Sequence, residues 1–287
     1  MEVVHKDPHC FGLELSRWTL QAIRSVCDWL SIADASGMSH LLKRIGISWK
    51  RGREHIHSPD PDYDAKLADL ERLLKDVRES RGLIVLLYLD ELTYYRQPSV
   101  ANCYEQCGKT QPLAELSHKS NATTRVAGAL DPLYGRIIYR QAPRVGVREL
   151  IRLYCDIRDA YSNAQRIYLV QDNWSVHFHP DVLVALEPQE FRWPTHPAPN
   201  WPTEPSPSAV RRFGNLRLPI QMVLLPTYAP WTNPIEKLWR MLKQVVLHMH
   251  RLSDDLPELR QRVCWFLDQF ASGSQELLRY VGITLPY

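Results

Sequence analysis

The chain has 287 residues, a length that allows between one and three domains, and its 45% hydrophobic content is enough for a buried core. No run of about eighteen apolar residues exists, so we expect no membrane span. The formal net charge is only +3, which excludes any inference about partners from bulk charge and leaves the local distribution to be examined.

The first sixty residues predict a small all-α domain of the helix-turn-helix type. Apolar residues recur at helical spacing from Ser16, a plausible N-cap, to about residue 32. A turn-like stretch over 34–37 follows, and a second short helix starts near Ser36 or Ser39 and stops at Gly46. Beside this second helix lies a basic patch that suits DNA phosphates: Lys43, Arg44, Lys50, Arg51 and Arg53. The alternative is a helical domain with a solvated basic edge.

The next elements predict an α/β domain. Residues 61–80 contain an amphipathic helix that we interpret as a linker helix. An apolar run over 83–89 is typical of a strand covered on both faces, and it ends in Asp90 and Glu91. A hairpin over 122–141, a helix over 147–161 and a second buried strand over 166–171 follow, with Asp172 and Asn173 ending that strand.

A proline-rich insert then interrupts the pattern over 187–219. Seven prolines fall within 187–207, so we interpret the insert as a loop or flap, partly polyproline II. A third strand over 220–225 follows, and prolines stiffen the turn after it. Asn233 is a good N-cap for a helix that carries Glu236, Arg240 and Lys243 off its apolar stripe. We expect the α/β domain to span 81–250 and a helical region to fill 251–287.

Three acids occupy matching positions in these elements. Asp90 ends one buried strand, Asp172 ends a second, and Glu236 opens a helix just after a third. Residues just past strand ends gather at one edge of an α/β sheet, where binding sites are built. Carboxylates collected there repel one another, and their hard oxygens suit Mg²⁺ or Mn²⁺. The alternatives are ordinary ones: a capping box for Glu236, and turn residues for the two aspartates.

Three motifs around these acids resemble the acidic motifs of the mariner-related insertion-sequence transposases, members of the DDE superfamily. They are Leu89-Asp90-Glu91, then Gln171-Asp172-Asn173 with His177 four residues beyond, and Leu225-Pro226-Thr227-Tyr228-Ala229-Pro230 leading to Asn233-Pro234-Ile235-Glu236 and Trp239. The resemblance implies an RNase H-like mixed sheet flanked by helices, behind a helix-turn-helix, winged-helix-type DNA reader. It makes Asp90, Asp172 and Glu236 the metal ligands and catalytic residues, with Glu91, Asn173 and His177 as accessory positions.

The chain departs from this family's pattern in three ways. The family usually carries two helix-turn-helix units, and here there is room for one. Asp172 and Glu236 are 64 positions apart, beyond the usual spacing, which the insert explains if it is a loop that leaves the acids in place. The tryptophan often found after the first strand is absent.

The resemblance implies a DNA transposase that cleaves phosphodiesters at element ends and joins the freed 3′-hydroxyl to target DNA, using two Mg²⁺ or Mn²⁺ ions. Arg240, Lys243 and the basic patch would hold phosphates. We expect double-stranded DNA and a homodimer as partners, no membrane, and a cytoplasmic, nucleoid-associated location, consistent with scattered cysteines and no signal peptide. The alternatives are an inactive or domesticated remnant that only binds DNA, and a stand-alone nuclease.

Overall fold

The computed structural model describes residues 2–50 and 57–283, and the chain divides into two compact units, Met1–Ile56 and His57–Tyr287. Arg51 and Arg53, expected in the basic patch, lie outside the described residues. Within the described part, no helix is both long and apolar enough to cross a bilayer.

The first unit is built from short helices: α1 (Glu2–His5), α2 (Leu20–Val26) and α3 (Ala35–Arg44), with 3-10 turns at Pro8–Phe11 and Asp28–Leu30. Helix α2 begins later than predicted because Thr19, not Ser16, is its N-cap, with Oγ1 accepting from the Ala22 amide at 3.1 Å. Asp34 caps α3 in the same way through the Gly37 amide at 2.7 Å. The two helices pack on a small core of Ile23, Cys27 and Met38.

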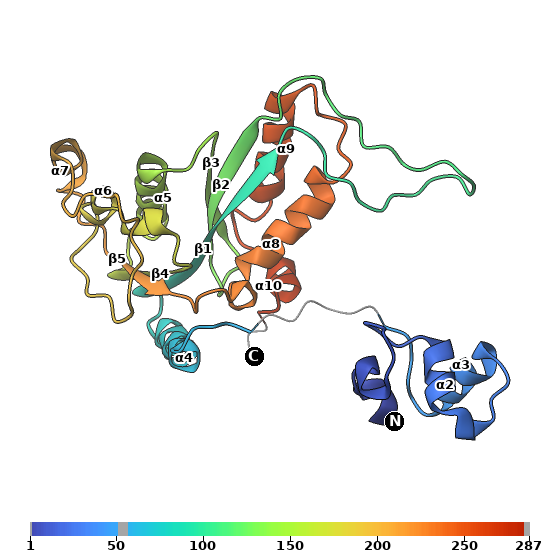
Figure 1. Cartoon of the computed structure of the whole chain (residues 1–287). Helices are drawn as coiled ribbons and strands as arrows, with labels where there is room; N and C mark the ends of the chain where they lie inside the picture. The colour runs from blue at the N-terminus through green and yellow to red at the C-terminus, as the bar shows by residue number, and fades with distance from the viewer. Residues whose placement is uncertain (1, 51–56, 284–287) are drawn as a thin grey trace. The chain divides into compact units, whose positions relative to one another are not determined.

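The second unit is organised on one mixed sheet of five strands (Figure 1). The strands are β1 (Ile84–Tyr95), β2 (Thr123–Leu130), β3 (Ile137–Ala142), β4 (Arg166–Gln171) and β5 (Ile220–Leu224), in the order β3-β2-β1-β4-β5. Pairs β1–β2 and β2–β3 are antiparallel, and pairs β1–β4 and β4–β5 are parallel. This matches the predicted mixed sheet.

Helices cover both faces of the sheet (Figure 1). On one face pack α4 (Tyr63–Glu79), α8 (Ile235–Leu242), α9 (Leu256–Asp268) and α10 (Gln275–Val281). On the other pack α5 (Val147–Ala160) and α6 (Pro180–Leu183). Strand side chains alternate between the faces, so Leu86 and Tyr88 of β1 lie in the α8 core while Leu87 and Leu89 lie in the α5 core.

Two expectations, for the first strand and for the helix before it, differ from the structure. Asp90 and Glu91 do not end their strand, because antiparallel pairing with β2 extends β1 to Tyr95 after its parallel pairing with β4 has stopped. The helix over 61–80 does not stand apart as a linker, since α4 buries Leu70, Leu73 and Val77 against the sheet of the second unit.

The proline-rich insert is not wholly irregular. It contains α7 (Pro207–Phe213), which Ser206 caps through the Ala209 amide at 3.2 Å. Its two ends are joined by a hydrogen bond from the Glu187 amide to the Leu218 carbonyl at 2.9 Å, next to a parallel bridge between Leu186 and Leu218. The insert therefore leaves and re-enters the fold at one place, and the strands on either side keep their register.

Candidate active site

Three acidic side chains line one pocket at the edge of the sheet. Asp90, Asp172 and Glu236 share it with Asn173 and with the loop that follows β5. The two aspartates reach it for one reason: the last parallel pair of β1 and β4 is Tyr88 with Val170, and each aspartate lies two residues beyond its member of that pair. The carboxyl ends of neighbouring parallel strands thus deliver both carboxylates to one edge, as the sequence predicted.

Asp90 is held on the α8 face by strand alternation and by a tryptophan. Its position is even, like those of Leu86 and Tyr88, so its side chain points toward α8. There the Trp239 indole N–H donates to Asp90 Oδ2 at 2.9 Å. Gly128, opposite Asp90 in β2, makes room for that ring, because a Cβ at this position would lie 2.8 Å from it. A glycine in a strand here marks a close approach of a neighbouring side chain.

Asp172 and Asn173 follow β4 in a turn. Asp172 Oδ1 accepts from the Trp174 amide at 2.9 Å, the local bond that the turn interpretation of this residue predicts. Asn173 has a different partner: its Nδ2 donates to Thr227 Oγ1 at 3.1 Å and ties the turn to the loop after β5. The turn role and the pocket position of Asp172 are therefore compatible.

Glu236 enters the pocket from the first turn of α8. The predicted N-cap at Asn233 is wrong, since Pro234 occupies that position and no side chain caps the helix. Asn233 is instead buried, and its Nδ2 donates to the Leu89 carbonyl at 3.1 Å. This bond anchors the start of α8 beside the strand that carries Asp90, which is why an acid 146 positions away in sequence lines the same pocket.

Burial and neighbouring carboxylates raise the pKa values of Asp90 and Glu236. Burial raises the pKa of Asp90 to about 8, and the charges of Glu91, Glu236 and Asp172 contribute to the same shift. Burial also raises the pKa of Glu236, with Asp172 adding to the shift while Lys243 and Arg240 oppose it. The pocket thus gathers negative charge that nearby cations offset only in part, as a site for a divalent cation requires.

Two of the predicted accessory residues lie on the opposite face of the sheet. Glu91 is one residue along from Asp90 and so points toward α5, where its Oε1 lies 3.5 Å from His177 Nε2. The fully buried His177 also contacts the Tyr154 hydroxyl through Nδ1 at 3.1 Å. Neither residue lines the acidic pocket. Alternation along β1 separates Glu91 from Asp90, and His177, in the 3-10 helix Ser175–Phe178, contacts Glu91 on that other face.

The predicted phosphate-binding cations are exposed where the structure describes them. Lys43, Arg44 and Lys50 are exposed in the first unit. Arg240 and Lys243 are exposed on α8 and the π-helical segment Lys243–Leu247 that continues it. Both lower the pKa of Glu236 through their charges, and Arg240 follows Glu236 by about one turn of α8.

The pocket fits a divalent cation by its donors rather than by a preformed cage. Among the described residues, no three His, Cys, Asp or Glu side chains are arranged to hold one ion. The carboxylates of Asp90, Asp172 and Glu236 nevertheless line one pocket and affect one another electrostatically. Carboxylate oxygens are the ligands that Mg²⁺ and Mn²⁺ prefer, and pairs of acids suit a site for two ions.

Sequence reasoning missed the residues that hold these acids in place. Trp239 belongs to the third motif and fits the apolar spacing of its helix, and only its indole N–H, which needs a partner when buried, indicates a second role. Gly128 gave no signal beyond being a glycine inside a strand. The sequence predicts a stiff turn around Thr227 but indicates no hydrogen-bond partner for it.

Comparisons with known proteins agree with this geometry. The profile of a family described as DDE superfamily endonuclease matches residues 85–260, more than half of the chain. The chain is 22% identical over 270 residues to the insertion element IS630 uncharacterized 39 kDa protein of Shigella sonnei, covering 93% of this chain and 68% of that one.

Solved structures show the same fold at low identity. The Mos1 transposase paired-end complex with left transposon end has a TM-score of 0.56 and 15% identity over 91% of this chain and 73% of that one. The Mos1 mariner paired end complex with Mn gives 0.55 and 16%, over 94% and 76%. Together with the family match and the three acids in one pocket, these findings show that the chain belongs to the DDE superfamily of endonucleases.

Proposed function

We propose that this endonuclease is a DNA transposase, which cleaves phosphodiesters at the ends of a mobile element and joins the freed 3′-hydroxyl to target DNA. The observation that carries the proposal is the single pocket lined by Asp90, Asp172 and Glu236. The similarity to an insertion-element protein and to the fold of Mos1 transposase supports transposition rather than simple hydrolysis.

In the proposed mechanism the three carboxylates hold divalent cations. When bound, two such ions supply the activation of a water and the stabilisation of the leaving 3′-oxygen. Asp90 is kept in position by the Trp239 indole, and Glu236 by the anchoring of α8 through Asn233. The similarity to Mos1 complexes that contain Mg or Mn supports either metal.

DNA is the proposed partner, held through its phosphates. Arg240 and Lys243 are exposed and their charges lower the pKa of Glu236, which supports a role for both in contacting the backbone of the strand being cut. Lys43, Arg44 and Lys50 would bind phosphates beside helix α3, with Arg51 and Arg53 as proposed additions. A homodimer that pairs two element ends is our further expectation, as is action on DNA in the cytoplasm, at the nucleoid.

The proposal is tested with DNA that carries the terminal inverted repeats flanking this chain's own gene. We expect nicking at the repeat ends in Mn²⁺ or Mg²⁺, none in EDTA, and joined product when target DNA is added. Asp172→Ala is expected to abolish nicking while DNA binding persists. Binding without nicking by the parent would leave a DNA-binding remnant, and nicking without any joined product would leave a nuclease.

A further inference from the structure

The loop between β5 and α8 is held in an unfavourable backbone conformation beside the acids. Tyr228 has φ +55°, a left-handed value that costs a bulky residue about 1–2 kcal/mol, and its side chain is 74% exposed at the pocket. The exposed ring contributes little packing of its own to offset that cost. Contacts of the neighbouring residues must therefore hold the loop in this shape.

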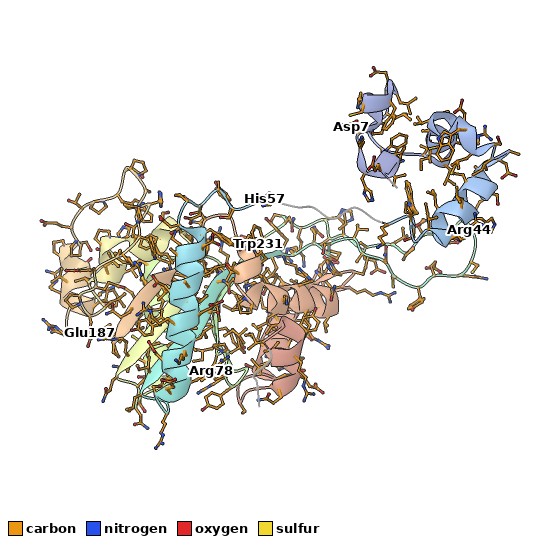
Figure 2. All side chains as sticks on the ribbon, turned by 90° about the horizontal axis from the view of Figure 1, so that it is seen from below. Asp7, Arg44, His57, Arg78, Glu187 and Trp231 are labelled. Atoms are coloured by element: carbon orange, nitrogen blue, oxygen red, sulfur yellow. The ribbon has the colours of Figure 1, made fainter. Side chains whose placement is uncertain are left out.

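Those contacts come from the segment that precedes α4. Asp60 Oδ2 accepts from the Thr227 amide at 2.7 Å, and Ser58 Oγ donates to the Thr227 carbonyl at 2.6 Å. Farther along, the Trp231 indole donates to the Tyr63 hydroxyl at 3.0 Å. In Figure 2 the labelled Trp231 accordingly lies next to the N-terminal end of α4. Both backbone groups of Thr227, the residue before Tyr228, are thus held by side chains from about 170 positions earlier.

A buried ion pair makes Asp60 a rigid anchor. Lys66 Nζ lies 2.7 Å from Asp60 Oδ2, and the two side chains are only 5% and 3% exposed. Asp60 Oδ1 also accepts from the Asp62 amide at 2.9 Å, so both carboxylate oxygens are occupied. Burial raises the pKa of Asp60, but the bonds from Lys66, Thr227 and Asp62 outweigh burial and hold the pKa at about 2.

The proline-rich insert covers this ion pair. Lys66 Nζ lies 5.6 Å from the centroid of the Trp193 ring, in a cation–π arrangement. The neighbouring Arg192 pairs with Asp69 of the same helix α4. The insert thus shields the pair from water, which strengthens the attraction between its charges.

The side chain of Thr227 contacts the turn after β4 that carries Asp172 and Asn173. Its Oγ1 accepts from Asn173 Nδ2 at 3.1 Å, and Asn173 directly follows Asp172. The connections therefore run from the buried pair through Thr227 to the residue beside a proposed metal ligand. We infer that Asp60 is a positioning residue: paired with Lys66 under the insert, it holds the Thr227–Tyr228 backbone so that the acidic pocket keeps its shape.

This inference rests on the proposed function for its catalytic readout, and two double variants test it. Asp60→Asn/Lys66→Met removes both buried charges but keeps an oxygen that accepts from the Thr227 amide. Asp60→Ala/Lys66→Met removes the charges and the acceptor together. Neither variant leaves an unpaired buried ion, so both avoid the main cause of misfolding at such a site. Glu258→Gln is the control, because it breaks an ion pair within α9 that touches neither the loop nor the insert.

Two measurements are made on the full chain: hydrogen–deuterium exchange of the Thr227 amide and the single-turnover rate of Mn²⁺-dependent DNA nicking. For the Ala/Met variant we expect faster exchange and a nicking rate lower by about 10-fold or more, with unchanged DNA affinity. The Asn/Met variant and the control are expected to stay within about 3-fold of the parent, well below that misplacement effect.

The inference is overturned if the Ala/Met variant, folded at the assay temperature, nicks at the parent rate. Equal losses in the two double variants would also overturn it, because the acceptor would then not matter. If the parent itself nicks no DNA, the proposed function fails. Exchange at Thr227 then decides the inference alone: protection lost only in the Ala/Met variant supports the anchor, and equal protection in both variants rejects it.

Discussion

Single hydrogen bonds and single glycines position the acids of this site. Asp90 depends on the Trp239 indole, and that ring depends on the space above Gly128. Strand alternation adds the other constraint, since Asp90 and the adjacent Glu91 point to opposite faces of the sheet. A substitution that removes one donor therefore tests positioning, provided that the nicking rate and the stability are measured separately.

Trp239→Phe is such a substitution. It removes the N–H that donates to Asp90 together with part of a fully buried ring, so we expect a stability loss of about 1–3 kcal/mol from the lost bond and the cavity. The freed carboxylate is expected to lower the nicking rate by about 10- to 100-fold. Denaturant unfolding and single-turnover nicking measure the two effects. Trp265→Phe, at a half-exposed position on α9, is the matched control, and a parent-like nicking rate for Trp239→Phe would exclude the positioning role.

Tyr228 makes a second prediction at this scale, because its φ is +55°. Glycine adopts that conformation freely, whereas valine is among the residues least able to do so. We expect Tyr228→Val to be less stable than Tyr228→Gly by about 1–2 kcal/mol in urea unfolding. Equal stabilities would mean that the loop does not hold a left-handed conformation at this residue.

At the scale of elements, the central strands and their helices were predictable from sequence, whereas the contacts between distant segments were not. The helix over 147–160 and strand β4 appear where apolar spacing placed them. The extension of β1 to Tyr95 was missed because it depends on pairing with β2 rather than on its own residues. The sequence predicts Asn233 as an N-cap because local chemistry favours it there, but its side chain donates to the Leu89 carbonyl instead.

The same limit applies to the candidate site. The positions of Asp90, Asp172 and Glu236 near the ends of predicted strands were enough to predict that the three acids lie together. The tie between Asp60 and Thr227 did not, since the two residues are 167 positions apart and neither belongs to a periodic pattern. Long-range polar contacts of this kind leave no mark in a single sequence.

The buried ion pair between Asp60 and Lys66, at the start of α4, predicts an acid-sensitive stability. The folded pKa of Asp60, about 2, is below its ordinary value of 3.8, so its contribution is present above that ordinary value and is lost as the pH falls toward 2. We expect the parent to lose about 1–2 kcal/mol more than Asp60→Asn/Lys66→Met between pH 5 and pH 2, in urea unfolding. Parallel stability curves would show that the pair contributes nothing.

Helix α8 predicts a salt-dependent interaction with DNA. If Arg240 and its neighbour Lys243 each bind a phosphate, replacing both by alanine should weaken binding. The slope of log affinity against log salt should then fall in magnitude by about 1.8, or about 0.9 for each lost contact. Gln244→Ala, at an exposed site in the same segment, should leave the slope unchanged. An unchanged slope in the double variant would remove these residues from the interface.

At the scale of the whole molecule, the two units differ greatly in the size of their cores. The first unit buries only a small apolar group around Ile23 and Met38, while the second packs helices on both faces of its sheet. A small core leaves a small margin of stability. We therefore expect urea unfolding in two transitions, the first with the smaller m-value and reported by Trp18, which packs on the core of the first unit.

Met38→Ala assigns those transitions. Met38 is 1% exposed, so its truncation should destabilise the first unit by about 2–4 kcal/mol and shift or abolish the first transition. The midpoint of the second transition should not move, because its cores contain none of these residues. A single transition that shifts as a whole would show that the units unfold together.

The proposed function requires that the three acids hold divalent cations. The position of bound manganese tests this requirement most directly. In crystals soaked with MnCl₂, anomalous scattering should locate manganese between Asp90 and Asp172 with Glu236 in its coordination, and Asp172→Ala should remove it. Manganese found elsewhere at saturating concentration, with this pocket empty, would contradict the account.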